Sequence, residues 1–280
     1  MNGLEAILLG IVQGLTEFLP ISSSGHLILV PWLGDIRYLE EHPDFNRTFD
    51  VATHLGTLVA VVAYFRADVA TMLRGTAGLV RKRAAETDGE RLALVVAIGT
   101  VPAVLVGAFG EDLLERHLGE PWQIAILLAV FGLLLAYADR RPERDRMDAI
   151  GPRKALIIGA SQAAALAPGV SRSGITITTG RFLGLDRDSA ARFSFFLLIP
   201  VTAGAVVKKG VDAAIDGIPA GQGVPTLLGI VAAGISGYVA IGGLLRLVRT
   251  RSYDAFVVYR LIAATVVLLL IATGVRSATF

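Results

Sequence analysis

Two short polar stretches, Pro20-Ile-Ser-Ser-Ser-Gly25 and Pro168-Gly-Val-Ser-Arg-Ser-Gly174, decide the fold because each interrupts a long apolar segment. The first stretch lies within residues 3–33 and the second within residues 155–185. Non-helical backbone at membrane depth is tolerated only where protein or a water-filled cavity satisfies its N–H and C=O groups. Each segment is therefore predicted to be a re-entrant hairpin, with a helical arm on either side of a break, that does not cross the membrane.

The composition places the rest of the chain in a membrane. Hydrophobic residues make up 54% and charged residues 18% of the 280 residues, whereas soluble domains carry about a quarter charged residues. Six apolar runs are long enough to cross a bilayer as helices, at about 51–65, 92–109, 122–138, 190–207, 226–247 and 255–274. The predicted fold is an all-α polytopic membrane protein with six transmembrane helices and two re-entrant helix-loop-helix hairpins.

The positive charges predict the orientation. They gather in three stretches, residues 66–91, 139–154 and 246–251. Short cytoplasmic loops are enriched in Lys and Arg, so these stretches are expected to face the cytoplasm. Two predicted spans already separate the second stretch from the third, so the segment 155–185 must enter and leave on the cytoplasmic face. By analogy, the segment 3–33 is expected to enter from the outside.

The two interrupted segments resemble each other, which predicts an internal repeat. Gly10 and Gln13 align with Gly159 and Gln162, and at the same offset Ser22-Ser-Ser-Gly25 aligns with Ser171-Arg-Ser-Gly174. Entry from opposite faces would make residues 1–138 and 155–280 an inverted-topology repeat within one membrane domain, 1–280. Chance similarity between turns rich in glycine and serine is the alternative.

The first break carries candidate catalytic residues. Gln13 and Glu17 share one helix face, and an ionisable residue in so apolar a segment is a functional candidate. Their oxygen ligands suit Mg²⁺ or Ca²⁺ and not zinc. Ser22, Ser23, Ser24 and His26 follow at the tip. The alternatives are a structural carboxylate, serines that cap a helix, and a structural histidine.

The second break supplies Ser171, Arg172 and Ser173. An arginine at membrane depth needs an anionic partner, and its forked guanidinium matches a phosphoryl group. Each break also precedes a helix, whose N-terminal N–H groups favour phosphate. A carboxylate, a cation, an arginine and helix N-termini together indicate phosphoryl transfer. His54 on the next helix is open to two interpretations, as a cavity-lining residue or as a buried structural one.

The chain resembles the undecaprenyl-diphosphate phosphatase family of the bacitracin-resistance type. The resemblance lies in Gln13-Gly-Leu-Thr-Glu-Phe-Leu-Pro-Ile-Ser-Ser-Ser-Gly-His26, in Pro168-Gly-Val-Ser-Arg-Ser-Gly-Ile-Thr176, in Phe49-Asp-Val-Ala-Thr-His-Leu-Gly56 and in Tyr259-Arg260. It covers essentially the whole chain. It implies hydrolysis of undecaprenyl diphosphate to the monophosphate, which recycles the cell-wall lipid carrier. It also implies a divalent cation, a site on the outer side of the cytoplasmic (inner) membrane, and frequent homodimers.

Carried onto this sequence, the resemblance assigns roles to five residues. Gln13 and Glu17 become the metal-binding pair, Ser23 and His26 the catalytic pair, and Arg172 the phosphate clamp. Gln13 stands where many members have a second glutamate, so metal binding by two carboxylates is in doubt. The expected substrate-binding residues are Ser22, Ser24, Gly25, Ser171, Ser173 and Gly174.

The sequence leaves alternatives open for the catalytic mechanism and for the class of function. Either Ser23 or His26 attacks the terminal phosphorus, or Glu17 activates water directly. The rival function is a polyprenyl-phosphate flippase or transporter, since inverted repeats with broken helices also mark transporters. The basic stretch 66–91 is expected to bind membrane lipid headgroups, and no nucleic-acid partner is expected.

Overall fold

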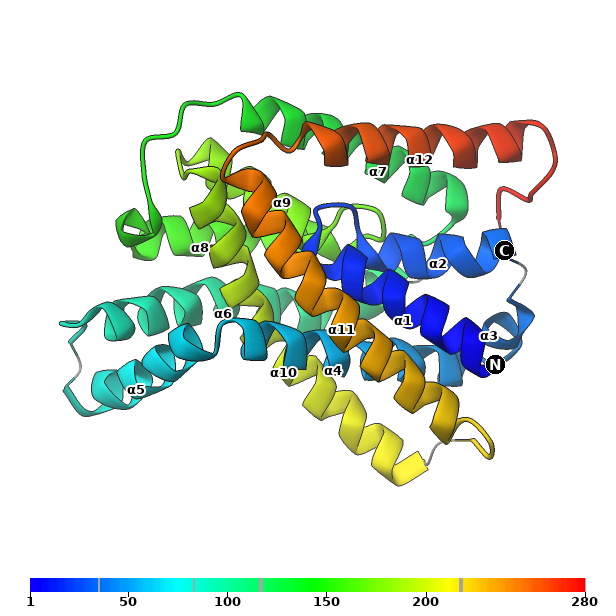
Figure 1. Ribbon diagram of the computed structural model, residues 1–280, viewed down its shortest axis with the longest axis horizontal. Coiled ribbons are helices and arrows are strands. Elements are labelled where there is room, and N and C mark those ends of the chain that lie inside the picture. The colour runs from blue at the N-terminus through cyan, green and yellow to red at the C-terminus, as the bar shows by residue number, and fades with distance from the viewer. Residues whose placement is uncertain (35, 83, 116–117, 217–218, 280) are drawn as a thin grey trace.

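The computed structural model describes residues 1–280 except 35, 83, 116–117, 217–218 and 280, and omits the side chains of 37, 40, 82, 108–115, 209 and 212–216. Within these limits the protein is helical (Figure 1). The longer helices are α1 (Gly3–Phe18), α2 (Ser23–Gly34), α4 (Pro43–Tyr64), α5 (Arg66–Lys82), α6 (Asp88–Glu115), α7 (Pro121–Asp139), α8 (Pro152–Ser161), α9 (Arg172–Phe182), α10 (Arg187–Asp216), α11 (Gly223–Val248) and α12 (Asp254–Ala272). The short helices are α3 (Arg37–Glu41), η1 (Met147–Ala149) and η2 (Gln162–Leu166).

Both predicted hairpins are present as pairs of short helices. The first is α1 and α2, of 16 and 12 residues, and the second is α8 with η2, followed by α9, of 10, 5 and 11 residues. A helix needs about 20 residues to cross the hydrocarbon core, so none of these arms is long enough to span a membrane by itself.

Each hairpin begins and ends at the same end of the molecule. The carbonyl of Gly184, just after α9, accepts the N–H groups of Arg144 and Asp145, which precede α8. At the opposite end, Met1 and Ile36 pack in one apolar cluster on either side of the first hairpin. Re-entry from opposite ends is what an inverted repeat requires. The repeat over 1–138 and 155–280 itself stays a prediction.

Within the described residues, five helices, α6, α7, α10, α11 and α12, are long and apolar enough to span a membrane, and the bent pair of α4 and α5 would be a sixth if the two helices form one span. The bend between α4 and α5 is 88°. Helix α4 alone is not apolar enough for a membrane span, because its first half carries the polar residues Asp44, Asn46 and Arg47. The six predicted spans are all helical, and the count of six stays a prediction.

The treatment of residues 66–91 as a loop was wrong, because residues 66–82 form α5, which packs along α6. Glycines permit this approach: a Cβ atom on Gly75 would lie 2.3 Å from the backbone of Gly89, and one on Gly78 would lie 2.3 Å from the Glu90 carboxylate. The basic side chains hid the helix because they occupy its exposed face while Val69 and Met72 are buried.

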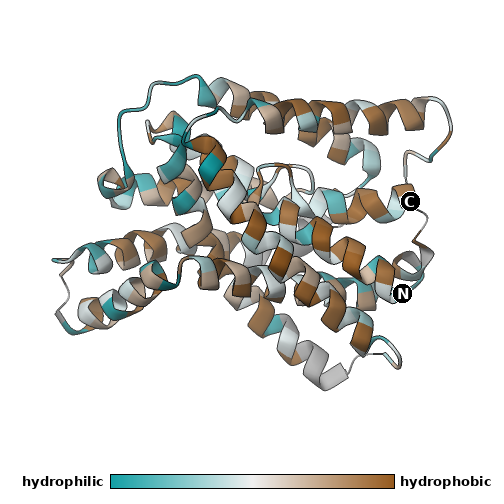
Figure 2. Cartoon of the chain, viewed as in Figure 1, coloured by the Kyte–Doolittle hydropathy of each residue, from teal (hydrophilic) through white to brown (hydrophobic). Residues whose placement is uncertain are grey.

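The three basic stretches meet at one end of the molecule, as the topology prediction requires. Arg249 Nε lies 2.9 Å from Asp188 Oδ1, and one cavity of about 730 Å³ is bordered by Asp68, Arg91 and Arg146 together. Hydrophilic colours concentrate in the connections at this end, whereas α12 and α7 are mostly hydrophobic (Figure 2). This end is called the basic end below.

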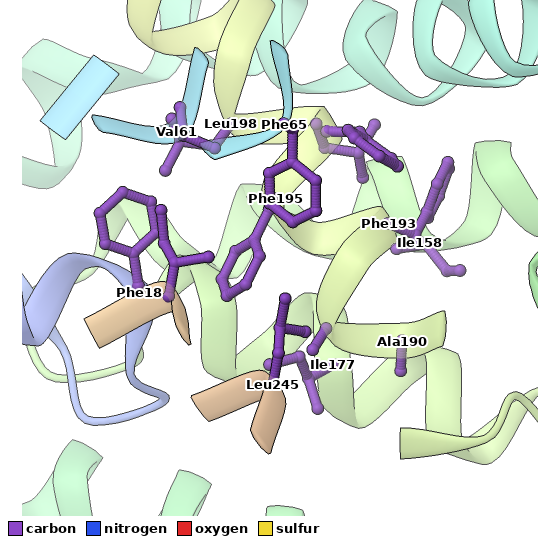
Figure 3. Close-up of a cluster of buried hydrophobic side chains, with 14 of the residues drawn as sticks. Phe18, Val61, Phe65, Ile158, Ile177, Ala190, Phe193, Phe195, Leu198 and Leu245 are labelled. Atoms are coloured by element: carbon purple, nitrogen blue, oxygen red, sulfur yellow. The ribbon is translucent and has the colours of Figure 1, made fainter. Parts of the chain in front are cut away.

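The main apolar core lies directly behind the first break. Phe18, the last residue of α1, meets Phe195 of α10 edge to face, with ring centroids 5.4 Å apart. Val61 and Phe65 from the end of α4 and Leu245 from α11 complete this part of the core (Figure 3). This packing fixes Phe18 at the end of α1, and thereby also the preceding residue, Glu17.

Candidate active site

The two breaks lie against each other, although nearly 150 residues separate them in the chain. The Gly169 N–H donates to Ser22 Oγ at 3.0 Å, and Ser173 Oγ donates to the Leu19 carbonyl at 3.0 Å. The two breaks are therefore close enough to contribute to one site.

Both breaks use the same strained backbone. Ser22 and Ser171 have φ angles of 76° and 77°, in the left-handed region that non-glycine residues rarely adopt. Each serine hydroxyl then accepts an N–H three residues on, from Gly25 at 3.3 Å and from Gly174 at 3.0 Å. Ser22 and Ser171 therefore cap helices α2 and α9. Their binding of substrate stays a prediction.

Glu17 is the centre of the site. Its side chain is buried, and its Oε1 accepts a hydrogen bond from Arg172 Nη2 at 2.8 Å. Its Oε2 accepts from Ser23 Oγ at 2.6 Å and from Gln13 Nε2 at 3.3 Å. The structure thus joins four of the predicted residues, and Arg172 reaches Glu17 from the other half of the chain.

His26 does not join this cluster. Its Nδ1 lies 2.7 Å from the Ser22 carbonyl and its Nε2 lies 2.7 Å from the Tyr259 hydroxyl. Since a carbonyl only accepts, Nδ1 carries the hydrogen and Nε2 accepts from Tyr259. Among the residues that the structure describes, no hydrogen bond links His26 to Ser23 or Glu17. The two residues expected as a catalytic pair therefore share no hydrogen bond within the described residues, and a catalytic role for His26 stays a prediction.

The imidazole beside the carboxylate belongs to His54. Its Nε2 lies 3.6 Å from Glu17 Oε2, and its Nδ1 bonds the Asp50 carbonyl at 2.8 Å. The Asp50 carboxylate lies 3.5 Å from the same Nδ1. The sequence left His54 open between a cavity-lining and a structural role; the structure places it beside Glu17, and its role stays a prediction.

The remaining candidates lie around this centre. Ser24 borders a cavity of about 690 Å³, together with Asp50 and Pro168. Gly25 and Gly174 are buried, and their missing side chains allow close packing: a Cβ atom would lie 3.2 Å from Gly169 N and from Arg260 Nη1, respectively. Contact of these residues with substrate stays a prediction.

The next feature of the site is the set of side chains that could hold a divalent cation. No group of three His, Asp or Glu side chains within the described part of the chain forms a ready-made metal site. However, Gln13 Oε1 is buried and has no hydrogen-bond partner there, while Nε2 of the same amide donates to the Glu17 carboxylate. Mg²⁺ is usually held by one or two carboxylates together with substrate phosphates. The residues therefore fit a cation that arrives with a phosphorylated substrate.

The fold and the site define a polytopic membrane protein with a partly buried serine–carboxylate–arginine centre between two helix N-termini, an arrangement suited to phosphate. Comparison with known proteins narrows this class. The family model described as bacitracin resistance protein BacA matches residues 6–266, and the chain belongs to that family.

Curated relatives agree along the full length. Undecaprenyl-diphosphatase of Geobacter sulfurreducens is 49% identical over 96% of this chain and 98% of its own. Undecaprenyl-diphosphatases of Pelobacter propionicus and Thermomicrobium roseum are each 46% identical, over 98% and 99% of this chain and over 99% and 100% of theirs.

Proposed function

We propose that this protein hydrolyses undecaprenyl diphosphate to undecaprenyl phosphate and inorganic phosphate, and so recycles the cell-wall lipid carrier and confers resistance to bacitracin. Its relatives carry the name of this activity. The observation that carries the proposal is the contact of Ser23, Glu17 and Arg172, at 2.6 and 2.8 Å, where the two breaks meet. The contact supports roles for Ser23 as the nucleophile, Glu17 as the base and Arg172 as the phosphate-binding group.

The geometry favours Ser23 as the nucleophile. Its Oγ already donates to Glu17 Oε2, so Glu17 can take the proton as Oγ attacks the terminal phosphorus. The Oγ–P bond forms, the bond from phosphorus to the bridging oxygen breaks, and undecaprenyl phosphate leaves. Arg172 and the first N–H groups of α2 and α9 stabilise the negative charge. Glu17 passes this proton to the departing phosphate or to solvent and is again a carboxylate. It then takes a proton from the water that attacks the phosphoserine, the Oγ–P bond breaks, inorganic phosphate leaves, and the proton passes from Glu17 to Ser23 Oγ.

We also propose a Mg²⁺ or Ca²⁺ ion as cofactor. Gln13 and Glu17 would hold it, and it would neutralise charge on the diphosphate. The buried free oxygen of Gln13 supports this assignment. Chelation is expected to abolish phosphate release, and added Mg²⁺ or Ca²⁺ to restore it.

We place the protein in the cytoplasmic membrane with the site open to the outside. Two observations support this orientation. The cavity beside Ser24 is also bordered by Leu39 of α3 and by Gly119, just before α7. The basic end, which is expected to face the cytoplasm, lies at the opposite end of the molecule. Membrane lipids would surround apolar side chains that are exposed, such as Val239 and Leu269. A homodimer is part of the proposal through the family resemblance alone.

Purified protein in detergent tests the reaction. Wild-type protein is expected to release phosphate from undecaprenyl diphosphate, and Ser23→Ala to lower the rate about 1,000-fold or more. Ser252→Ala, which changes a partly exposed serine at the basic end, is the matched control. Acid quenching followed by mass spectrometry should find phosphate on Ser23. Active protein without a phosphoserine would favour direct attack by water, and lipid movement in liposomes without phosphate release would favour a flippase.

A further inference from the structure

Arg260 lies within the apolar helix α12, yet its side chain is fully buried. Its guanidinium donates to five backbone carbonyls at 2.8–3.3 Å, those of Pro20, Leu127, Leu128, Gly169 and Val170. Among the described residues no carboxylate forms an ion pair with it. A buried charge without a counter-charge is costly, so its hydrogen bonds must be well satisfied for it to persist.

Three of these carbonyls belong to the two breaks. Arg260 Nη1 donates to Pro20 O at 3.0 Å, and Nη2 donates to Gly169 O at 2.8 Å; both nitrogens lie 3.2 Å from Val170 O. Pro20 comes three residues before Ser23, and Val170 two residues before Arg172. One planar group therefore joins the backbone segments that carry the attacking hydroxyl and the phosphate-binding arginine.

The rest of the guanidinium is fixed on α7. Arg260 Nε donates to Leu128 O at 2.9 Å, and Nη2 reaches Leu127 O at 3.3 Å. The stem packs on Gly132, where an added Cβ atom would lie 3.3 Å from Arg260 Cβ. The side chain thus transmits the position of a membrane helix to both breaks.

We propose that Arg260 is a positioning residue for the phosphatase reaction, which holds Ser23 and Arg172 at the separation that a diphosphate requires. This inference rests on the function proposed above. A displacement of about 1 Å in such a site costs about 100-fold in rate. Lysine would keep the charge but not the fork, because its ammonium donates from a single point.

Steady-state kinetics of Arg260→Lys test the proposal against Arg181→Lys. Arg181 is also fully buried and donates to the carbonyls of Asp139, Arg141 and Leu185, but it lies at the basic end. Arg260→Lys is expected to lower kcat about 100-fold and to change KM less than about threefold. Monodisperse Arg181→Lys is expected to keep kcat within about twofold, even if its melting temperature falls.

Hydrogen exchange gives a readout that needs no activity. In Arg260→Lys the capped amides of Gly25, Gly169 and Gly174 should exchange faster, while Arg181→Lys should leave them unchanged. Exchange at wild-type rates, a wild-type kcat in Arg260→Lys, or an equal loss of kcat in Arg181→Lys would each overturn the proposal. If the wild-type protein released no phosphate, the proposed function would fail first, whatever the exchange result.

A second pair of variants guards against misfolding of Arg260→Lys. Gly132→Ala adds a methyl group against Arg260 and leaves its charge in place, whereas Gly204→Ala adds one where nothing lies within 4 Å. We expect Gly132→Ala to lower kcat severalfold, and a loss of about 10-fold would correspond to a modest displacement of the breaks. Gly204→Ala should be neutral, and equal activity of the two variants would contradict a positioning role.

Discussion

The two breaks share a backbone but not a chemistry. In each, a serine with φ near 76–77° caps the following helix, and a glycine three residues on allows close packing. The helices that precede the breaks also correspond: a Cβ atom on Gly10 of α1 would lie 2.4 Å from Gly229 O of α11, and one on Gly159 of α8 would lie 2.2 Å from Gly99 O of α6. Each hairpin therefore packs on a long helix of the other half.

The side chains at matching positions differ. When the two hairpins are aligned, Leu166 corresponds to Glu17 and Arg172 corresponds to Ser23. Ile175 corresponds to His26. The first hairpin thus carries the acid and the hydroxyl, and the second carries the guanidinium that is proposed to bind phosphate. Neither break can perform the proposed reaction alone, so the contact between them is as necessary as any single residue.

The largest expected effect comes from removing the acid that only the first break has. Glu17→Gln keeps the shape but loses the ion pair with Arg172 and the proton acceptor for Ser23. General-base catalysis contributes about 100- to 10,000-fold, so kcat should fall by about 1,000-fold or more. Phosphate release by purified protein measures this loss.

The matched control is Glu90→Gln, a buried carboxylate that accepts the N–H groups of Glu86 and Thr87 at the start of α6. It should lower stability slightly and leave kcat unchanged. If Glu17→Gln were no more damaging than Glu90→Gln, the division of chemistry between the breaks would be wrong.

A smaller effect should come from the shared framework. Gly10→Ala and Gly159→Ala each place a methyl group against a backbone carbonyl, and such overpacking costs about 1–3 kcal/mol. The two variants should lower the melting temperature by similar amounts. A large effect at one glycine and none at the other would show that the two halves do not share a packing scheme.

Much of this arrangement could be predicted from the sequence, because the strongest constraints are local. The breaks at Ser22 and Ser171 follow from polar residues within apolar segments, and Glu17 and Arg172 follow from the cost of charge at membrane depth. The identity of the imidazole near Glu17 could not be predicted. It depends on how α4 rotates His54 towards α1, which tertiary packing decides.

Arg260 shows a second kind of limit. An arginine in the apolar run 255–274 is a visible signal, and the sequence marked it only as part of a resemblance. Its partners are backbone carbonyls, which every residue has, so no side-chain pattern identifies them. Helix α5 was missed for the opposite reason: its exposed charges were interpreted as topology signals, although a buried face accompanied them.

The smallest expected effect on kcat concerns the hydrogen bond of His26. In the aligned second hairpin the position of His26 is occupied by Ile175, which cannot form such a bond. Tyr259→Phe removes the hydroxyl that donates to His26 Nε2 at 2.7 Å. A hydrogen bond of this kind contributes about 1 kcal/mol, so the melting temperature should fall slightly. Because His26 is not bonded to Glu17 or Ser23 in the described part of the chain, kcat should fall less than about fivefold. A loss as large as that of Glu17→Gln would instead place Tyr259 and His26 on the proton path, and the chemistry of the first break would then extend beyond the Glu17 cluster.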